Sequence, residues 1–243
     1  MAYAIVQQKD GINNAGTSVS TGNFASSPTT GNLIYVVASC DSAGGTFNTP
    51  TDTLGNTYTL IGSAIESGTS AAIYQWYAKN ITGGGANSVT ATTTGTSTVI
   101  GIAACEISGL DAATPLDVHA EQGGPGGSGA NAMTSGTATN TKQPSVIIGF
   151  QRDIQGPVEA AGTSPIAFTA LTAIWNNISG SGETRGLFEH ARLTTTGSVE
   201  ATFQDTGFDR YLVCMAVFAE GSGGGGSATY QPMIYQRKTL YFI

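Results

Sequence analysis

Charge is what this sequence has least of. Only 10% of its 243 residues are Asp, Glu, Lys or Arg, whereas about a quarter is typical of soluble domains. Bases are scarcest early in the chain, because residues 1–141 contain only Lys9 and Lys79. No basic stripe is available to follow a phosphate backbone, so the sequence predicts no nucleic-acid partner. A polar but weakly charged surface suits packing against copies of the chain, since little charge must be desolvated.

Cysteine is scarce too. The three cysteines, Cys40, Cys105 and Cys214, lie in or near apolar runs, and nothing resembles a C-x-x-C pair. We expect small buried thiols in a reduced protein. The first ten residues lack a basic region followed by an apolar core, and no run approaches transmembrane length. These features predict no membrane partner, and a chain that is kept in a cytoplasm or leaves it without a cleaved signal.

Sustained helical periodicity is absent as well, and the sequence instead has short runs typical of β-strands. Residues 71–109 contain three such runs in succession, with a glycine break at 83–85 after the first. This pattern predicts a meander of three antiparallel strands. In the first of them, Tyr74, Trp76 and Ala78 alternate with more polar residues, as in a strand with one covered face. About a dozen such runs along the chain predict an all-β fold, a two-sheet, jelly-roll-like β-sandwich.

The sandwich is expected to consist of two similar halves, at about 30–110 and 143–220. Residues 187–221 repeat the pattern of the meander, and residues 145–152 (SVIIGFQR) match the apolar run at 32–39 (NLIYVVAS). Residues 33–40 are apolar on both faces, which predicts a central strand that is covered on both sides. Residues 145–152 are expected to be the central strand of the second half. The segments 10–31, 110–120 and 123–129 are expected to be a polar loop, an irregular return crossing and a loop between the halves. Together the halves form one predicted domain, residues 1–220.

The composition changes after Glu220. Residues 221–227 (GSGGGGS) form a Gly/Ser tether, natural or engineered, with a root-mean-square reach of roughly 15 Å. Residues 228–243 follow as an amphipathic docking arm, whose apolar side chains are costly to expose to water. Either a partner subunit or the same chain is expected to hold this arm, as a strand added to a sheet edge. The predicted docking residues are Tyr230, Met233, Ile234, Tyr235, Leu240, Tyr241, Phe242 and Ile243.

Candidates for chemistry are few, and no catalytic residue and no cofactor is predicted. Residues 124–129 (GPGGSG) fit a phosphate-binding glycine pattern, but they do not follow a strand and Pro125 lacks the N–H that phosphate needs. His119 and His190 are the only imidazoles, and neither has a partner at metal-ligand spacing. Glu189 is next to His190, but on a strand the two side chains point to opposite faces.

Two further sets of residues each leave two interpretations open. Asp41, Asp52 and Asn56 are weak candidates for a calcium site, because hard cations prefer oxygen ligands in turns. The alternative is an Asx-type turn that supports a tight reversal at Gly55. Aromatic residues could stack on sugar rings or pack in a core, and the apolar side of the strand that carries Trp76 favours the core. These aromatic residues are Tyr74, Trp76, Tyr77 and Trp175.

Several short motifs resemble a widespread group of β-sandwich modules in tailed-phage structural proteins and large bacterial surface proteins. The group has the pattern D-x-x-G-N-x-Y-T … Y-Y-A-K-N … E-Y-S-G … P-L-D. This chain has Asp52-x-x-Gly55-Asn56-Thr57-Tyr58-Thr59, Tyr77-Ala78-Lys79-Asn80, Glu106-Ile107-Ser108-Gly109 and Pro115-Leu116-Asp117. The resemblance covers about residues 30–220, with Ile107 at the position of the Tyr in E-Y-S-G. It implies the sandwich fold and brings no catalytic residues.

Two functions follow as expectations. The first is a non-enzymatic structural protein on the surface of a phage particle, assembled in the host cytoplasm, with copies of itself and other virion proteins as partners. In this version it decorates or cements the capsid and is anchored by the arm. The second is a carbohydrate-binding or adhesive module of a phage or bacterial surface, with glycans as partners and an exposed row of aromatics.

Overall fold

The structure of the protein is a computed structural model. It describes residues 2–41, 46–66, 71–97, 99–125, 129–154, 159–163, 166–171, 175–177, 184–205 and 210–221. These residues form antiparallel strands and contain no helix, so the prediction of an all-β fold is confirmed. The described part of the chain accordingly offers no helix that could cross a bilayer.

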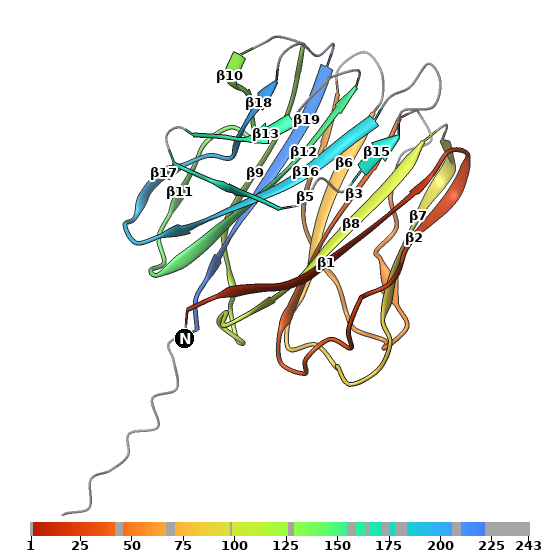
Figure 1. Ribbon diagram of the computed structural model, residues 1–243, viewed down its shortest axis with the longest axis horizontal. Coiled ribbons are helices and arrows are strands. Elements are labelled where there is room, and N and C mark those ends of the chain that lie inside the picture. Colours follow the sequence, from red (N-terminus) through yellow and green to blue (C-terminus); the bar gives the residue numbers. More distant parts are fainter. Residues whose placement is uncertain are drawn as a thin grey trace, which may run out of the picture.

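Two large sheets form the middle of the molecule (Figure 1). The first has the order β1 (Ala4–Asn13), β8 (Ile100–Ser108), β3 (Leu33–Cys40), β6 (Ala72–Ala78) and β5 (Thr59–Ile65). The second has the order β9 (Leu116–Pro125), β19 (Arg210–Ala219), β12 (Ser145–Ile154), β16 (Thr184–Leu193) and β14 (Thr169–Ala170), and β15 (Trp175–Asn177) also pairs with β16. We call β1 to β8 the first half and β9 to β19 the second half. In both large sheets the first strand of the half lies at one edge, the last strand of the half is next to it, and β3 or β12 is in the middle. The two sheets therefore have the same strand order.

Each large sheet is covered on its outer face by smaller sheets. In the first half the outer layer is β2 (Gly16–Asn23), β7 (Ser88–Ser97) and β4 (Thr51–Asp52). In the second half it consists of β10 (Gly129–Thr134), β18 (Thr202–Asp205) and β13 (Glu159–Ala161), with β11 (Ala138–Asn140) paired to β17 (Gly197–Val199). The two outer layers lie on opposite sides of the molecule, with β2 and β7 at the right of Figure 1 and β11 and β17 at the left.

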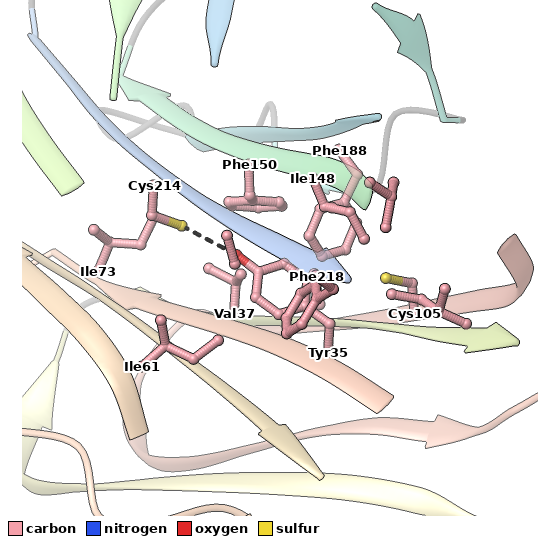
Figure 2. Packing of buried hydrophobic residues seen from close by; sticks show 14 of the residues in the cluster. Tyr35, Val37, Ile61, Ile73, Cys105, Ile148, Phe150, Phe188, Cys214 and Phe218 are labelled. Carbon is pink, nitrogen blue, oxygen red and sulfur yellow. Dashed lines mark hydrogen bonds between the residues drawn. The ribbon is translucent and has the colours of Figure 1, made fainter. Parts of the chain in front are cut away.

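Three apolar cores separate these layers. The central core lies between the two large sheets and includes Tyr35, Phe150, Phe188 and Phe218 (Figure 2). The other two cores lie between each large sheet and its outer layer. All eight residues of β3 are buried, because alternate side chains enter the central and the outer core. The prediction that residues 33–40 form a central strand covered on both faces is therefore confirmed, and β12 lies between β16 and β19 as the predicted central strand of the second half.

The predicted three-stranded meander is wrong. β6 and β8 both pair with β3, whereas β7 pairs with β2 and β4 in the outer layer. The prediction that β6 has one covered face is also wrong, because Gln75 is buried and Tyr77 packs against the central core. Alternating polarity was misleading here, because the buried Gln75 satisfies its polar atoms with hydrogen bonds across the core.

Three predicted loops contain strands. Residues 10–31 include the end of β1 and all of β2, and residues 110–120 include the first half of β9. The predicted loop at 123–129 contains the end of β9 and the first residue of β10. These strands are rich in Gly, Ser and Thr or lie at sheet edges, so they lack the apolar alternation that marks a strand in sequence. The repeated strand order consequently begins at β1 and β9, earlier than the matching apolar runs suggested.

Candidate functional site

The last described residues, Glu220 and Gly221, are fixed at a definite point on the scaffold. The eight predicted docking residues of the arm, at 230–243, lie outside the described residues. Glu220 forms a β-bridge with Leu110, and its N–H donates to the carbonyl of Pro144 at 2.8 Å. The N–H of Gly221 donates to the carbonyl of Gly109 at 2.8 Å. Gly221, the last described residue, therefore lies beside the turn that joins the two halves.

A polar cluster lies around this exit point. Arg192 donates to both carboxylate oxygens of Glu220, at 2.5 and 2.9 Å. The Tyr3 hydroxyl is 2.8 Å from Nδ1 of His190, and burial together with the charge of Glu220 raises the pKa of Tyr3. Gly109 has φ +78°, and a Cβ there would lie 2.5 Å from the carbonyl oxygen of Ala2. The first and last described segments thus meet at one end of the molecule.

Asp52, a weak metal candidate, is the centre of a closed turn. Its carboxylate accepts hydrogen bonds from the N–H groups of Leu54 and Asn56, both within 3.1 Å, and from the side chains of Asn56, Tyr58 and Asn87. Burial opposes ionisation, but these hydrogen bonds outweigh it and lower the pKa of Asp52. Gly55 has φ +74°. The Asx-turn interpretation describes this site, whose donors occupy the oxygens that a cation would need.

The other metal candidate, Asp41, forms an ion pair with Arg152 of the second half. The Arg152 side chain is 2% exposed and that of Asp41 is 15% exposed, so a buried guanidinium of one half pairs with a partly buried carboxylate of the other. Asp41 and Asp52 therefore have different partners and do not form one site. Within the described residues, no group of three or more His, Cys, Asp or Glu side chains is placed to hold a metal.

The remaining motif residues also connect segments of the scaffold. Lys79 and Asn80 donate to the carbonyls of Ala113 and Ala112 in the link between the halves. The buried Glu106 accepts bonds from Gln7, from the Thr29 N–H and from Asn32. Asp117 accepts bonds from Thr141 and from the Lys142 N–H. These motifs therefore mark hydrogen-bonded supports of loops.

The two histidines are not brought together. His119 is on β9, where its Nδ1 is 2.9 Å from Glu121, whereas His190 is on β16 and contacts Tyr3. β9 and β16 belong to the same large sheet, but two strands, β19 and β12, lie between them. Glu189 is buried on the face away from Tyr3, where its carboxyl accepts bonds from the N–H groups of Gly162 and Thr202. The prediction that Glu189 and His190 do not form a dyad is confirmed.

The aromatic residues of β6 are in cores. Trp76 is 1% exposed and packs against Tyr74 and Phe47 in the first outer core, with ring centroids 5.6 and 6.1 Å away. Tyr77 contacts Phe218 in the central core. Core packing is therefore confirmed for Trp76, and the described aromatics of this strand form no exposed row. The side chain of Trp175 lies outside the described residues.

Sequence reasoning missed a polar connection inside the central core. The Tyr35 hydroxyl donates to Oε1 of Gln75 at 2.6 Å, and Nε2 of Gln75 donates to Glu121 of the second half at 2.5 Å. The Cys214 thiol lies 3.7 Å from the Tyr35 hydroxyl (Figure 2). Burial raises the pKa of Cys214 and Cys105, and all three cysteines are buried free thiols as expected. A lone Gln in an apolar strand was the available signal for this network.

The glycine pattern at 124–129 is not a phosphate loop in its described part. Gly124 and Pro125 end strand β9, and Gly129 begins β10. A Cβ at Gly124 would lie 2.6 Å from the ring of Tyr211, so this glycine allows close packing instead.

Comparison with protein-family models, with curated proteins and with solved structures found no match for this chain.

Proposed function

We propose that this chain is a non-enzymatic structural protein of a phage particle, a capsid decoration or cement protein held in place by its C-terminal arm and by contacts between subunits. The proposal rests on the way the scaffold ends. Glu220 and Gly221 are fixed by backbone hydrogen bonds and by the Arg192 ion pair. A Gly/Ser tether and eight large apolar side chains follow in the sequence. A rigid body with an oily arm on one fixed point suits anchorage to an assembly.

The interior of the scaffold supports the same proposal. The side chains first considered for chemistry, including Asp52, Glu106 and Asp117, hold loops of the same chain. Two large sheets share one apolar core, and the Asp41–Arg152 ion pair joins the two halves. Such a unit favours display in many copies over the movement that a catalytic cycle needs.

The alternative, a glycan-binding module with an exposed aromatic row, has less support in this form. The row would need Trp76 and Tyr77, which pack in two different cores.

Removal of the arm tests the proposal. Native particles are purified on a density gradient, and the chain is detected in the fractions with an antibody. The full chain is expected to sediment with particles, whereas a variant that ends at Ser227 is expected to remain at the top with an unchanged melting temperature. A matched variant keeps residues 228–243 and replaces the tether glycines at 223–226 with serine, and it is expected to sediment with particles. Equal sedimentation of the truncated variant, or a full chain found only as free protein, would refute the proposal.

A further inference from the structure

Strand β5 carries two of the three large apolar side chains that the described residues expose. Leu60 is 52% exposed and Ile65 is 64% exposed, and the third is Val6 on β1, at 44%. β5 is an edge strand of the first large sheet and pairs only with β6 among the described strands. An exposed apolar edge strand favours contact with another segment of polypeptide. The cover for this edge therefore has to come from outside the described residues.

The exposed side chains of β5 lie on the outer side of the sheet. Leu60 is opposite Trp76 and Ile65 is opposite Ala72, and residues that face each other across two strands share one face. Trp76 and Ala72 belong to the first outer core, but the outer layer leaves Leu60 and Ile65 exposed. The partly buried Tyr74 lies between these positions and stacks on Trp76. We call Leu60, Ile65 and Tyr74 the apolar ledge, which is about 14 Å long from the residue spacing in strands.

The other face of β5 meets an acidic group. Gly62 has no side chain, and a Cβ there would collide with the carboxylate of Glu121 on β9. The Glu121 side chain is 11% exposed, and its ion-pair partner is His119. Among the described residues, no Lys or Arg pairs with Glu121. A segment that covers β5 and carries basic residues would therefore meet an opposite charge at this edge.

The C-terminal arm matches both features of this edge. Residues 228–243 contain eight large apolar side chains, and their only charged residues are Arg237 and Lys238. Sixteen residues span about 50 Å when extended, so the arm is long enough to cover the whole of β5. The arm thus offers apolar groups for the ledge and positive charge for the acidic face.

We infer that the apolar ledge binds the C-terminal arm of a second copy of this chain, which lies along β5 as an extended segment. The inference rests on the proposed function for the anchoring role of the arm, and it adds the surface that receives the arm. Each copy then gives its own arm and receives another. This contact is head-to-tail, so it can continue from subunit to subunit.

The position of Gly221 favours a second copy over the chain's own arm. Gly221 is bonded to Gly109 at the end of β8, and β8 is three strands away from β5. This distance is about 14 Å, which uses nearly all of the roughly 15 Å root-mean-square reach of the tether. The tether would also have to pass the link between the halves, where Lys79 donates to the carbonyl of Ala113. The chain's own arm would then enter beside Thr59 and run parallel to β5, and parallel pairing is slightly less stable than antiparallel pairing. The arm of a second copy has neither constraint.

Sedimentation velocity with full-length variants tests this inference. The wild-type chain is expected to associate as its concentration rises. The ledge variant L60S/I65S and the arm variant L240S/F242S each remove apolar contacts without adding charge, and each is expected to associate at least about tenfold more weakly. An equimolar mixture of the two variants is expected to form a one-to-one complex, because one supplies an intact arm and the other an intact ledge. Melting temperatures measured at low concentration should equal that of the wild type.

Val6→Ser is the matched control, since Val6 is exposed on β1, at the opposite edge of the same sheet, and it should associate like the wild type. A mixture that does not associate would overturn the inference, and so would a ledge variant that associates as strongly as the wild type. A wild-type chain that stays monomeric at every concentration also contradicts it. If L60S/I65S then lowers the melting temperature only while the arm is intact, the chain's own arm occupies the ledge.

This inference and the proposed function can fail separately. Sedimentation with particles that requires the arm, together with a mixture that does not associate, supports the proposed function and refutes the ledge as the receiving surface. Association of the mixture, together with a full chain that never sediments with particles, gives the reverse result.

Discussion

The two halves share one strand order, but the carboxyl groups that support their outer layers differ in ionisation. In the first half, the hydrogen bonds on Asp52 outweigh its burial and lower its pKa, so the group is a carboxylate. In the second half, Glu189 lies under the outer layer, where burial raises its pKa to about 8 although the Gly162 and Thr202 N–H groups act in the opposite direction. One architecture thus uses an ionised support on one side and a largely protonated one on the other.

This difference shows which parts of the repeat are constrained. The central strands must fill the shared core, so β3 and β12 are both apolar on both faces. The outer layers face solvent on one side and are free to differ, both in their supports and in their exposed groups. Three substitutions test this division, from the shared core outward.

The largest effect is expected in the shared core, where the halves should not behave independently. Phe188 is fully buried, with its ring 4.7 Å from Phe150 and 5.8 Å from Tyr35 of the first half. We expect Phe188→Ala to lower the free energy of unfolding by about 3–5 kcal/mol. Hydrogen exchange should increase in both halves, measured by mass spectrometry alongside urea denaturation. Leu60→Ala, at a residue that is 52% exposed, is the control and should change stability by less than about 0.5 kcal/mol. Faster exchange in the second half alone would show that the halves unfold separately.

The strands of the shared core are also the part of the fold that the sequence predicts well. Runs such as Leu33–Cys40 are apolar on both faces, and only burial on both sides explains that composition. β2 and β9 were not predictable in the same way. β2 consists of Gly, Ser, Thr and Asn around one buried Val19, and β9 has Gly123 and Gly124 near its end, where they pair with Leu212 and Tyr211. Their strand structure depends on partners that are distant in the sequence.

The roles of the candidate residues were predictable only where the contacts are local. The turn at Asp52 depends on Asn56 and Tyr58 a few positions later, and the sequence indicated it. Gln75 and Glu121 are 46 positions apart, and the ion pair of Asp41 and Arg152 joins different halves. Which face of which sheet each residue occupies decides these contacts, and no local pattern contains that information.

A smaller effect is expected at the carboxylate of the first half. Asp52→Ala leaves donors from Leu54, Asn56, Tyr58 and Asn87 without their acceptor. We expect a loss of about 2–3 kcal/mol in unfolding free energy, with faster exchange in β4 and β7 and little change in the second half. Because folding lowers the pKa of Asp52, its contribution is present at neutral pH and is lost as the pH falls through the folded pKa. Asp111→Ala is the control, since among the described residues the Asp111 carboxylate accepts hydrogen bonds only from Ala113 and Thr114 in an exposed turn, and its loss should cost under about 1 kcal/mol. A uniform loss of protection in both halves would contradict a local support.

Below about pH 5 the smallest effect is expected at Glu189, where Glu189→Gln replaces a carboxyl group that is largely protonated, and the pH dependence of its contribution has the opposite sign to that of Asp52. Folding raises the pKa of Glu189 from 4.5 to about 8, so the folded state binds this proton more tightly than the unfolded state does. The stabilisation is complete below about pH 4.5 and is lost as the pH rises toward 8, with a slope of at most about 1.4 kcal/mol per pH unit. Glu189→Gln keeps an acceptor for the Gly162 N–H but does not ionise, so it should flatten this slope between pH 5 and 9 and slow exchange in β13 and β18 at alkaline pH. Glu200→Gln, at a partly exposed carboxyl of the same layer, should leave the slope unchanged. If the wild-type slope persists in Glu189→Gln, then another group binds the proton, and the contrast between the two supports does not rest on their ionisation.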